Sequence, residues 1–419
     1  MSKSMFLQCV ICGRQYGLSE VTYTCPDCGE AGTLDILYDY AALRASVDRD
    51  AIGHSSLMNV WRYKALLPIA DESPVPSLSV GWTPLYNAPR VAESLGLRQV
   101  WLKDDGRNPT ASYKDRASVV VVTRAMELGI RTVSAASTGN AAAALAGVMA
   151  SVPHMQTIIF VPATAPEAKI AQLLVYGAQV ILIEDSYDVA FDLCMQISLE
   201  ANWYCRNTGV NPFTTEGKKS ASLEIAEQLG WRVPDVVVVS VGDGSIISGL
   251  YKGFWDLYQL GWTDRMPRII GVQAEGSSAL VQAWRLGIAG QDMQPAPAET
   301  IADSISAGLP RDRVKALRAV RQTNGAYVAV SDEQILAAIP QLARLSGVFA
   351  EPASAAAFAG AQIAVESGYI HSEERVLLML TGNGLKDIKR AQQAVSGGLR
   401  VPPDLAIIRQ ALLNKIETP

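Results

Sequence analysis

From Arg90 onward, short runs rich in valine, isoleucine and leucine alternate with longer amphipathic stretches. Apolar runs of about four to eight residues are typical of strands that are buried on both faces. When a helix joins each such strand to the next, the strands pair in parallel and helices cover both faces of the sheet. The alternation therefore predicts a three-layer α/β enzyme, in which ligands bind at the carboxyl ends of the strands.

The clearest elements of this pattern predict two parallel sheets. Helices are expected at residues 140–150 and 167–176, and strands at residues 132–136, 157–161, 179–183, 236–241, 269–273 and 376–380. We expect a small α/β domain formed by residues 113–225. A large α/β domain is expected from residues 41–112 and 226–419.

Length and composition limit the class of protein. The chain has 419 residues, of which 49% are hydrophobic, so two or three domains with a large buried core are expected. Only 18% of the residues are charged and the net charge is −5, which argues against a disordered chain and a nucleic-acid partner. The N-terminus lacks the apolar run of a signal peptide, and no stretch reaches the roughly 18 apolar residues of a membrane span. We therefore expect a cytoplasmic protein without a membrane contact.

Four of the six cysteines lie within the first 28 residues, in two CxxC pairs that are each followed by glycine. The pairs are Cys9 with Cys12 and Cys25 with Cys28. Four thiolates at this spacing can surround Zn²⁺ tetrahedrally, which leaves no open coordination position and makes the site structural. We predict a zinc-ribbon-like segment over residues 1–40. The alternative is that the two pairs hold no metal and their thiols are simply reduced.

Three glycine-containing turns follow expected strands, at residues 137–140, 242–245 and 381–384. Each would present backbone N–H groups at a helix N-terminus, where anions bind. The turn at 242–245 follows the strongest strand and is the best candidate for a phosphate site. A dinucleotide fingerprint would need a further glycine where Ile247 stands, and the G-x-S-x-G elbow of a serine hydrolase is absent around Ser245.

Upstream of these turns, residues 108–116 read NPTASYKDR. This segment resembles the signature of the threonine synthases, members of the fold-type II pyridoxal-phosphate enzymes related to the tryptophan synthase β chain. The resemblance extends to the three turns and to Glu351-Pro352-Ala353-Ser354-Ala355-Ala356-Ala357, in the same order and spacing. Some threonine synthases also carry a cysteine-rich N-terminal segment.

The resemblance implies a role for each matching residue. Lys114 would hold pyridoxal 5′-phosphate as a Schiff base and move protons during the reaction. The other implied cofactor contacts are Asn140 at the 3′-oxygen, Gly242, Asp243, Gly244, Ser245 and Ile246 at the phosphate, and Thr381 at the pyridine nitrogen. Ser137 and Thr138 would cradle the substrate carboxylate, and Asn108, Ser112 and Glu351 would line the pocket. A hydroxyl such as that of Thr381 keeps the ring a mild electron sink, which favours elimination and replacement over transamination.

The activity implied by the resemblance is a lyase reaction that converts O-phospho-L-homoserine and water to L-threonine and phosphate. A second hypothesis is β-elimination or β-replacement on serine, threonine or a phosphorylated amino acid, as in dehydratases or cysteate synthase. A third is a non-catalytic binding protein on the same fold. Analogy with the fold favours a homodimer whose ligand is a small amino acid.

The sequence departs from the family at several positions. Beside the lysine, Ala111 and Ala117 replace glycines and Tyr113 replaces phenylalanine, which would alter the volume and polarity of the pocket. Within the segment that contains Asn211, a candidate substrate contact, Gly209 replaces a serine and Thr214 an arginine that help the family hold the substrate phosphate. The positive charges available as substitutes are Lys218, Lys219 and Arg116. We expect Lys218 or Lys219 to face the pocket, or else a substrate other than phosphohomoserine.

Overall fold

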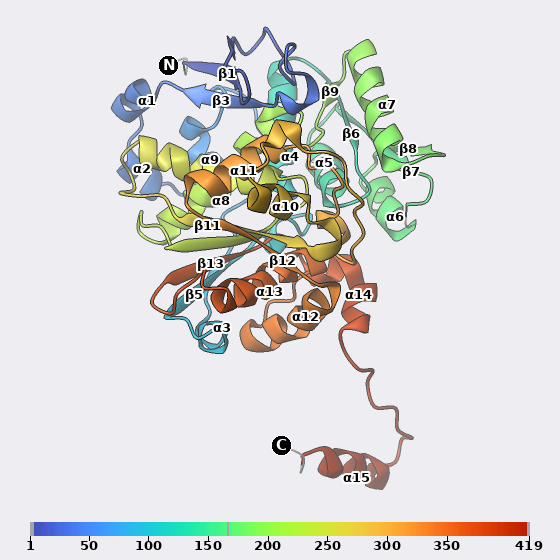
Figure 1. Ribbon diagram of the computed structural model, residues 1–419. Helices are drawn as coiled ribbons and strands as arrows, with labels where there is room; N and C mark the ends of the chain where they lie inside the picture. Colours follow the sequence, from blue (N-terminus) through green and yellow to red (C-terminus); the bar gives the residue numbers. More distant parts are fainter. Residues whose placement is uncertain (1–3, 166, 417–419) are drawn as a thin grey trace.

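A computed structural model describes residues 4–165 and 167–416 of the chain. Its strands form a three-stranded sheet near the N-terminus and two larger sheets of six and four strands (Figure 1). The prediction of an α/β fold with several sheets and a small N-terminal module is confirmed.

The six-stranded sheet has the order β12-β11-β10-β13-β5-β4. Its strands are β4 (Leu85–Asn87), β5 (Gln99–Asp104), β10 (Val236–Ser240), β11 (Arg268–Ala274), β12 (Ala326–Val330) and β13 (Arg375–Leu380). All neighbours pair in parallel except β4, which runs antiparallel to β5 at the edge. The three predicted strands of this sheet are present, whereas β4, β5 and β12 were not predicted.

Helices cover both faces of this sheet because its central strands are apolar on both sides. Val236 and Val238 of β10 belong to one buried cluster, whereas Val237 and Val239 belong to another on the opposite face. One face carries α3 (Pro89–Ser94), α12 (Asp332–Ser346) and α13 (Pro352–Glu366). The other carries α8 (Pro212–Gln228), α9 (Ser245–Gln259), α10 (Ala279–Leu286) and α11 (Arg313–Gln322).

The four-stranded sheet is parallel and has the order β8-β7-β6-β9. Its strands are β6 (Thr132–Ala136), β7 (Gln156–Pro162), β8 (Gln179–Ile183) and β9 (Tyr204–Cys205). The helices between them are α5 (Asn140–Ala150), α6 (Glu167–Val175) and α7 (Tyr187–Glu200). Every strand and helix predicted in this region is present.

Two helices carry the chain between the two sheets. They are α4 (Lys114–Glu127), which leads into the four-stranded sheet, and α8, which leads out of it, and they pack against each other. The predicted domain boundary at 225/226 falls inside α8, and the assignment of domains stays a prediction. Because Lys114 is the first residue of α4, it lies where the chain leaves one sheet for the other.

The N-terminal sheet has the order β2-β1-β3 and is antiparallel; its strands are β1 (Met5–Cys9), β2 (Gln15–Tyr16) and β3 (Leu34–Tyr38). Polar contacts fix it to the helices of the body. The Lys315 ammonium of α11 donates to the Leu34 carbonyl at 3.0 Å, and Arg318 pairs with Asp35 at 2.6 Å. Two helices follow, α1 (Tyr40–Ser46) and α2 (Arg49–Gly53).

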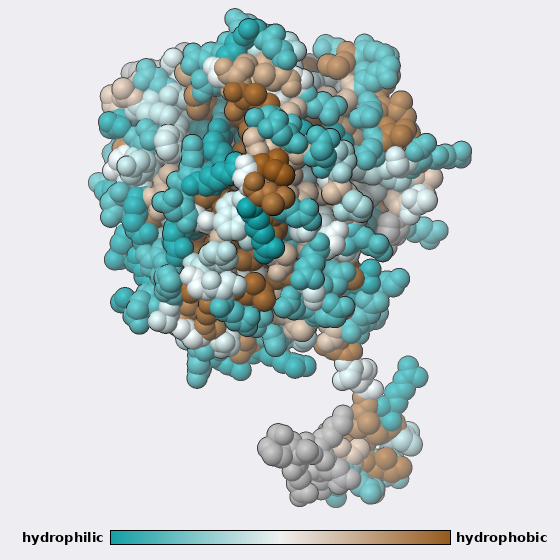
Figure 2. Space-filling model, in the orientation of Figure 1, coloured by the Kyte–Doolittle hydropathy of each residue, from teal (hydrophilic) through white to brown (hydrophobic). Residues whose placement is uncertain are grey.

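The C-terminal segment leaves the body after α14 (Ile388–Gln393) and ends in α15 (Leu405–Ile416), which stands apart from the sheets (Figure 1). Apolar residues gather on this helix in the space-filling view (Figure 2), and Leu405, Ile407 and Leu412 are exposed. Among the described residues, none of the helices combines the length and apolar character needed to cross a lipid bilayer.

Candidate active site

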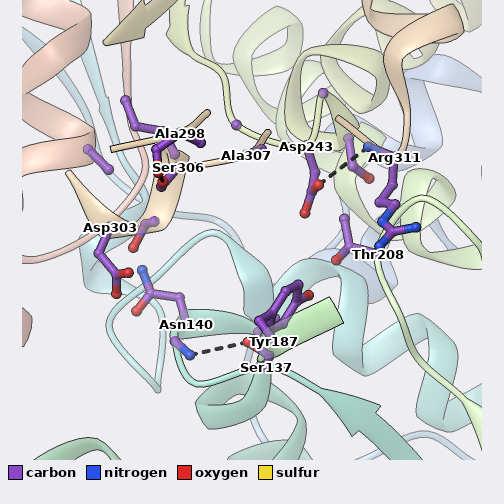
Figure 3. A pocket seen from close by; sticks show the side chains of 18 of the residues that line it. Ser137, Asn140, Tyr187, Thr208, Asp243, Ala298, Asp303, Ser306, Ala307 and Arg311 are labelled. Carbon is purple, nitrogen blue, oxygen red and sulfur yellow. Dashed lines mark hydrogen bonds between the residues drawn. The ribbon is translucent and has the colours of Figure 1, made fainter. Parts of the chain in front are cut away.

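A cavity of about 640 Å³ lies where the carboxyl ends of strands from both larger sheets meet. Its wall is formed by the turns after β6, β10 and β13, together with Lys114 and a segment around Ser304. Figure 3 shows Ser137 and Asn140 on one side of this cavity and Asp243 and Arg311 on the other. The three predicted glycine turns are therefore brought together, because the carboxyl ends of parallel strands in both sheets border the same cavity.

Lys114 projects into this cavity from the first turn of α4 and is half-buried. In the described part of the chain its amine has neither a hydrogen-bond partner nor a carboxylate within ion-pair distance. Burial lowers the pKa of Lys114 below its usual value, and the nearby charge of Arg206 lowers it further. Such an amine can attack a carbonyl and accept a proton near neutral pH.

The loop before Lys114 is held by buried polar contacts. The Thr110 backbone N–H donates to the Asp115 carboxylate at 2.8 Å, and Ser112 bridges to Gly382 after β13. Ala111 has a φ of +64°, a left-handed conformation that explains why glycine is the family's residue at this position. Tyr113 is fully buried and its hydroxyl donates to the Lys218 carbonyl at 2.7 Å, so it ties α4 to α8 rather than facing the cavity.

The turn after β10 leaves backbone N–H groups free at the N-terminus of α9. Gly244 has a φ of +86°, and a Cβ there would lie 2.7 Å from the Ala316 Cβ, so the turn requires glycine. No side chain within the described residues caps this helix end. The buried Lys218 amine donates to the Ser245 hydroxyl at 2.6 Å. Backbone donors, a helix N-terminus and an adjacent amine together form an anion site.

The turn after β6 lies opposite, at the N-terminus of α5. Ser137 and Thr138 line the cavity, and the Asn140 side-chain amide donates to both oxygens of Glu351 at 3.0 Å. Burial raises the pKa of Glu351 above its usual value, although the Asn140 hydrogen bonds oppose the change. In this arrangement the Asn140 amide is engaged by Glu351, so its bond to a cofactor oxygen stays a prediction.

Most of the predicted contacts line the cavity, and several do not. The predicted residues in its wall are Lys114, Ser137, Thr138, Asn140, Gly242, Asp243, Gly244, Ser245, Ile246, Glu351 and Thr381. Those outside the wall are Asn108, Ser112, Arg116, Asn211, Lys218 and Lys219. Of this second group, Asn108 and Ser112 are buried in the loop that supports Lys114, and Lys218 reaches Ser245 from behind the phosphate turn.

The three remaining residues serve the fold, which differs from the sequence-based expectation. Arg116 is completely buried between Asp105 and Glu224. Lys219 donates to the Tyr38 hydroxyl of β3 at 3.0 Å and pairs with Asp256 of α9 at 2.7 Å. Asn211 caps α8: its side-chain oxygen accepts from the Phe213 N–H at 3.0 Å and its amide donates to the Cys205 carbonyl at 2.9 Å.

Two arginines in the cavity wall, Arg206 and Arg311, were missed by sequence reasoning. Arg206 follows the two-residue strand β9, which is too short to show a periodic pattern. Arg311 approaches Gly209, which has a φ of +78°; a Cβ at Gly209 would lie 2.5 Å from the Arg311 Cβ. The replacement of the family's serine by Gly209 was the available signal, because the missing side chain leaves room for an arginine.

The four N-terminal cysteines form a compact cluster, and none of them lines the cavity. Their sulfur atoms all lie within 4.8 Å of one another, and the Cys12 and Cys25 sulfurs are 3.8 Å apart. Tetrahedral zinc with Zn–S bonds of about 2.3 Å places its sulfur ligands about 3.8 Å apart. The cluster therefore has the composition and size of a structural zinc site.

Comparisons with known proteins agree with this geometry. Residues 76–382 match the family model described as pyridoxal-phosphate dependent enzyme. The chain is 39% identical to the threonine synthase of Methanocaldococcus jannaschii, over 97% of this chain and 99% of that protein. It is 40% identical to the threonine synthase of Methanosarcina acetivorans, over 98% of this chain and 99% of that protein.

Solved structures resemble the chain in fold at lower identity. One is threonine deaminase isoform 2 of Solanum lycopersicum, with a TM-score of 0.63 and 21% identity over 75% of this chain and 87% of that chain. Another is diaminopropionate ammonia lyase of Escherichia coli, with a TM-score of 0.65 and 16% identity over 81% of this chain and 93% of that chain. The fold is therefore shared with enzymes that are named for different amino-acid substrates.

Proposed function

Because the chain belongs to the pyridoxal-phosphate-dependent enzymes and, within them, to the threonine synthase family, we propose that it converts O-phospho-L-homoserine and water to L-threonine and phosphate. The observation that carries this proposal is the half-buried amine of Lys114, which faces the same cavity as an uncapped helix N-terminus. The amine of Lys114 can react with a carbonyl, and the N-terminus of α9 can bind a phosphate. Pyridoxal phosphate contains both of these groups.

The shape and polar groups of the cavity wall fit this cofactor. The turn at Gly242 and Gly244 has no room for side chains, since a Cβ on Gly242 would lie 2.8 Å from the Ile305 Cα. The hydroxyl of Ser240, at the end of β10, is buried without a partner among the described residues. When bound, the cofactor would withdraw electrons from the substrate's α-carbon. The turn at 242–246 would hold its phosphate and Thr381 would face its ring nitrogen.

Residues of the chain would then transfer the proton and bind the substrate. Lys114 would bind the cofactor covalently at rest and, once released, would take the proton from the substrate's α-carbon. The lowered pKa of Lys114 supports this role because a neutral amine is needed as the base. Ser137 and Thr138, at the N-terminus of α5, would bind the substrate carboxylate through hydroxyl and backbone donors.

The function is tested by supplying purified enzyme with phosphohomoserine, phosphoserine, serine and threonine in separate assays. Release of phosphate and formation of threonine are measured together with release of oxo acid. We expect threonine and phosphate to form from phosphohomoserine and no turnover of the other three compounds. Oxo acid formed from serine or threonine, without turnover of phosphohomoserine, would establish the dehydratase alternative. Absence of turnover with all four compounds would favour the non-catalytic alternative.

For the N-terminal module we propose one structural Zn²⁺ bound by Cys9, Cys12, Cys25 and Cys28. The close packing of the four sulfurs supports this proposal. Gly32 supports it further, because a Cβ there would lie 2.6 Å from the Cys28 Cβ and would crowd the cluster. Four protein ligands leave no position for a substrate, so the metal would stabilise the module rather than take part in the reaction.

We also propose that the enzyme is a cytoplasmic homodimer. The C-terminal segment supports the dimer, since α15 extends from the body with apolar side chains exposed. Light scattering of the full chain and of a chain that ends at residue 396 tests this. We expect a dimer for the full chain; a monomer at micromolar concentration would contradict the proposal.

A further inference from the structure

Arg206 is a buried cation in the cavity wall that lacks a counter-charge. Its side chain is 1% exposed. The Nε atom donates to the Ser118 hydroxyl at 3.3 Å and Nη1 donates to the Thr208 hydroxyl at 2.8 Å, while Nη2 has no partner. In the part of the chain that the structure describes, no carboxylate lies within ion-pair distance of this guanidinium. Burying a charge without a carboxylate beside it is costly, unless a bound anion compensates the charge.

The other cations that line the cavity, or reach its phosphate turn, are already engaged. Arg311 pairs with Asp188 at 3.0 Å and reaches Glu30 at 3.5 Å. Lys218 donates to Ser245 in the turn that suits the cofactor phosphate. Lys114 is assigned to the cofactor itself. Of the three cations that line this cavity, Arg206 is thus the one with neither a carboxylate partner among the described residues nor an assigned role.

The immediate surroundings of Arg206 suit a phosphate group. Its neighbour Thr208 also lines the cavity and lies beside Arg311 in Figure 3, on the side away from Asn140. A guanidinium presents two parallel N–H donors to a phosphate, and a threonine hydroxyl can add a third. The substrate carboxylate would have a separate site at Ser137 and Thr138, in the turn before α5.

The structure also explains why the family's arginine position is not used here. Thr214 is fully buried and its hydroxyl donates to the Asn211 carbonyl at 2.7 Å, so it does not face the cavity. The first turn of α8, where the family has its arginine, therefore offers no charge to the cavity at this position.

We propose that Arg206, supported by Thr208, binds the phosphate of the amino-acid substrate and so selects phosphorylated over unphosphorylated substrates. The inference rests on the proposed function, whose substrate carries a phosphate on its side chain. It assigns the recognition of this leaving group to a residue that does not correspond to the family's arginine.

The test compares two ligands that differ only in the charged group. 2-Amino-5-phosphonopentanoate has the length of phosphohomoserine with a carbon in place of the ester oxygen, and L-norvaline is the same chain without the phosphonate. Binding of each to the holoenzyme is measured from the change in cofactor absorbance. The variants are Arg206→Gln and Arg206→Lys, and Thr214→Val is the control at the family's position.

Loss of a charge-assisted pair of hydrogen bonds should weaken phosphonate binding about 10- to 100-fold in Arg206→Gln, with a smaller loss in Arg206→Lys. Norvaline binding should change less than about twofold, and Thr214→Val should bind both ligands as the wild type does. Because the buried charge is uncompensated, we expect Arg206→Gln to melt at the same or a higher temperature than the wild type. A purely structural arginine would instead lower the melting temperature.

Each other outcome is informative. Unchanged phosphonate binding in Arg206→Gln, or an equal loss for both ligands, would overturn the inference while phosphate release by the wild type upholds the proposed function. If the wild type itself binds the phosphonate no better than norvaline, the proposed function and the inference both fail. If Arg206→Gln gives no soluble holoenzyme, the Arg206→Lys comparison decides the question.

Discussion

Replacement of Arg116 by methionine should destabilise the protein without a specific effect on substrate binding. The guanidinium lies between two buried carboxylates, with Nε 2.6 Å from Asp105 and Nη1 2.6 Å from Glu224. Lys103 also pairs with Glu224, at 2.8 Å. All four side chains are buried, so removal of Arg116 leaves two carboxylates to share one ammonium away from bulk solvent.

The magnitude follows from the effect of this cluster on Glu224. Burial alone would raise the pKa of Glu224, but the charges of Arg116 and Lys103 outweigh it and lower the pKa from 4.5 to about 2. At 1.36 kcal/mol for each tenfold change in proton affinity, the lowering corresponds to about 3 kcal/mol of stability at neutral pH. Breaking a buried ion pair by removing one partner typically costs about 3–5 kcal/mol. We therefore expect Arg116→Met to lose about 3–4 kcal/mol in the free energy of unfolding.

The pH dependence gives an independent check. Because the pKa of Glu224 is lower in the folded state, its contribution to stability is complete above the unfolded pKa of 4.5 and is lost as the pH falls through about 2. The difference between wild type and variant should therefore be largest near neutral pH and should shrink below about pH 4.5.

The assay is urea unfolding followed by circular dichroism at several pH values, together with steady-state kinetics. Arg375→Met serves as the control, since Arg375 pairs with Asp235 at 3.0 Å but is 31% exposed. Its loss should be within about 1 kcal/mol. If Arg116→Met keeps the wild-type urea midpoint but raises the KM for phosphohomoserine, Arg116 binds substrate and its assignment to the buried charge cluster is wrong. Arg116→Lys, which keeps the charge, provides the comparison if the methionine variant does not fold.

Three further outcomes are expected. Lys114→Ala should abolish the fixation of cofactor onto the chain by borohydride; fixation at another lysine would contradict the assignment. Metal analysis should find one Zn²⁺ per wild-type chain and none in Cys25→Ser, which should also melt at a lower temperature with its cofactor absorbance unchanged. Lys218→Met should weaken pyridoxal-phosphate binding about 10- to 100-fold in titrations of the apoenzyme, because the buried amine beside Ser245 no longer assists the phosphate turn; wild-type affinity would exclude Lys218 from the phosphate site.

The parts of the fold that were predicted from sequence are those in which local pattern and tertiary role agree. Strand β10 consists of valines before a serine because both of its faces are buried. Strand β5 was missed because its second half contains Lys103 and Asp104. Lys103 is buried in the sheet only because Glu224, far along the chain, neutralises it. A pattern that depends on a distant partner cannot be recognised from the local sequence.

The same limit applies to the site. The glycine turns and Lys114 were predictable because their backbone requirements lie within a few consecutive residues. For Arg116, Arg206 and Lys219, the sequence shows only a positive charge, and the three have different roles. Arg116 and Lys219 have buried carboxylate partners, whereas Arg206 has none among the described residues. A cation is thus available to a ligand only where the tertiary structure places no carboxylate beside it.

The strand order of the large sheet has a consequence for how the chain is made. Strand β5 pairs with β13, so residues 99–104 cannot complete this pairing until residues 375–380 are made, after every other described strand of the two larger sheets. The strands of the four-stranded sheet, by contrast, all lie within residues 132–205 and can pair much earlier. Until β13 inserts between β5 and β10, both of these strands expose an open edge, and open edges favour pairing with other chains. Slow refolding from denaturant and a need for chaperones during translation are the expected costs of completing the centre of the sheet last.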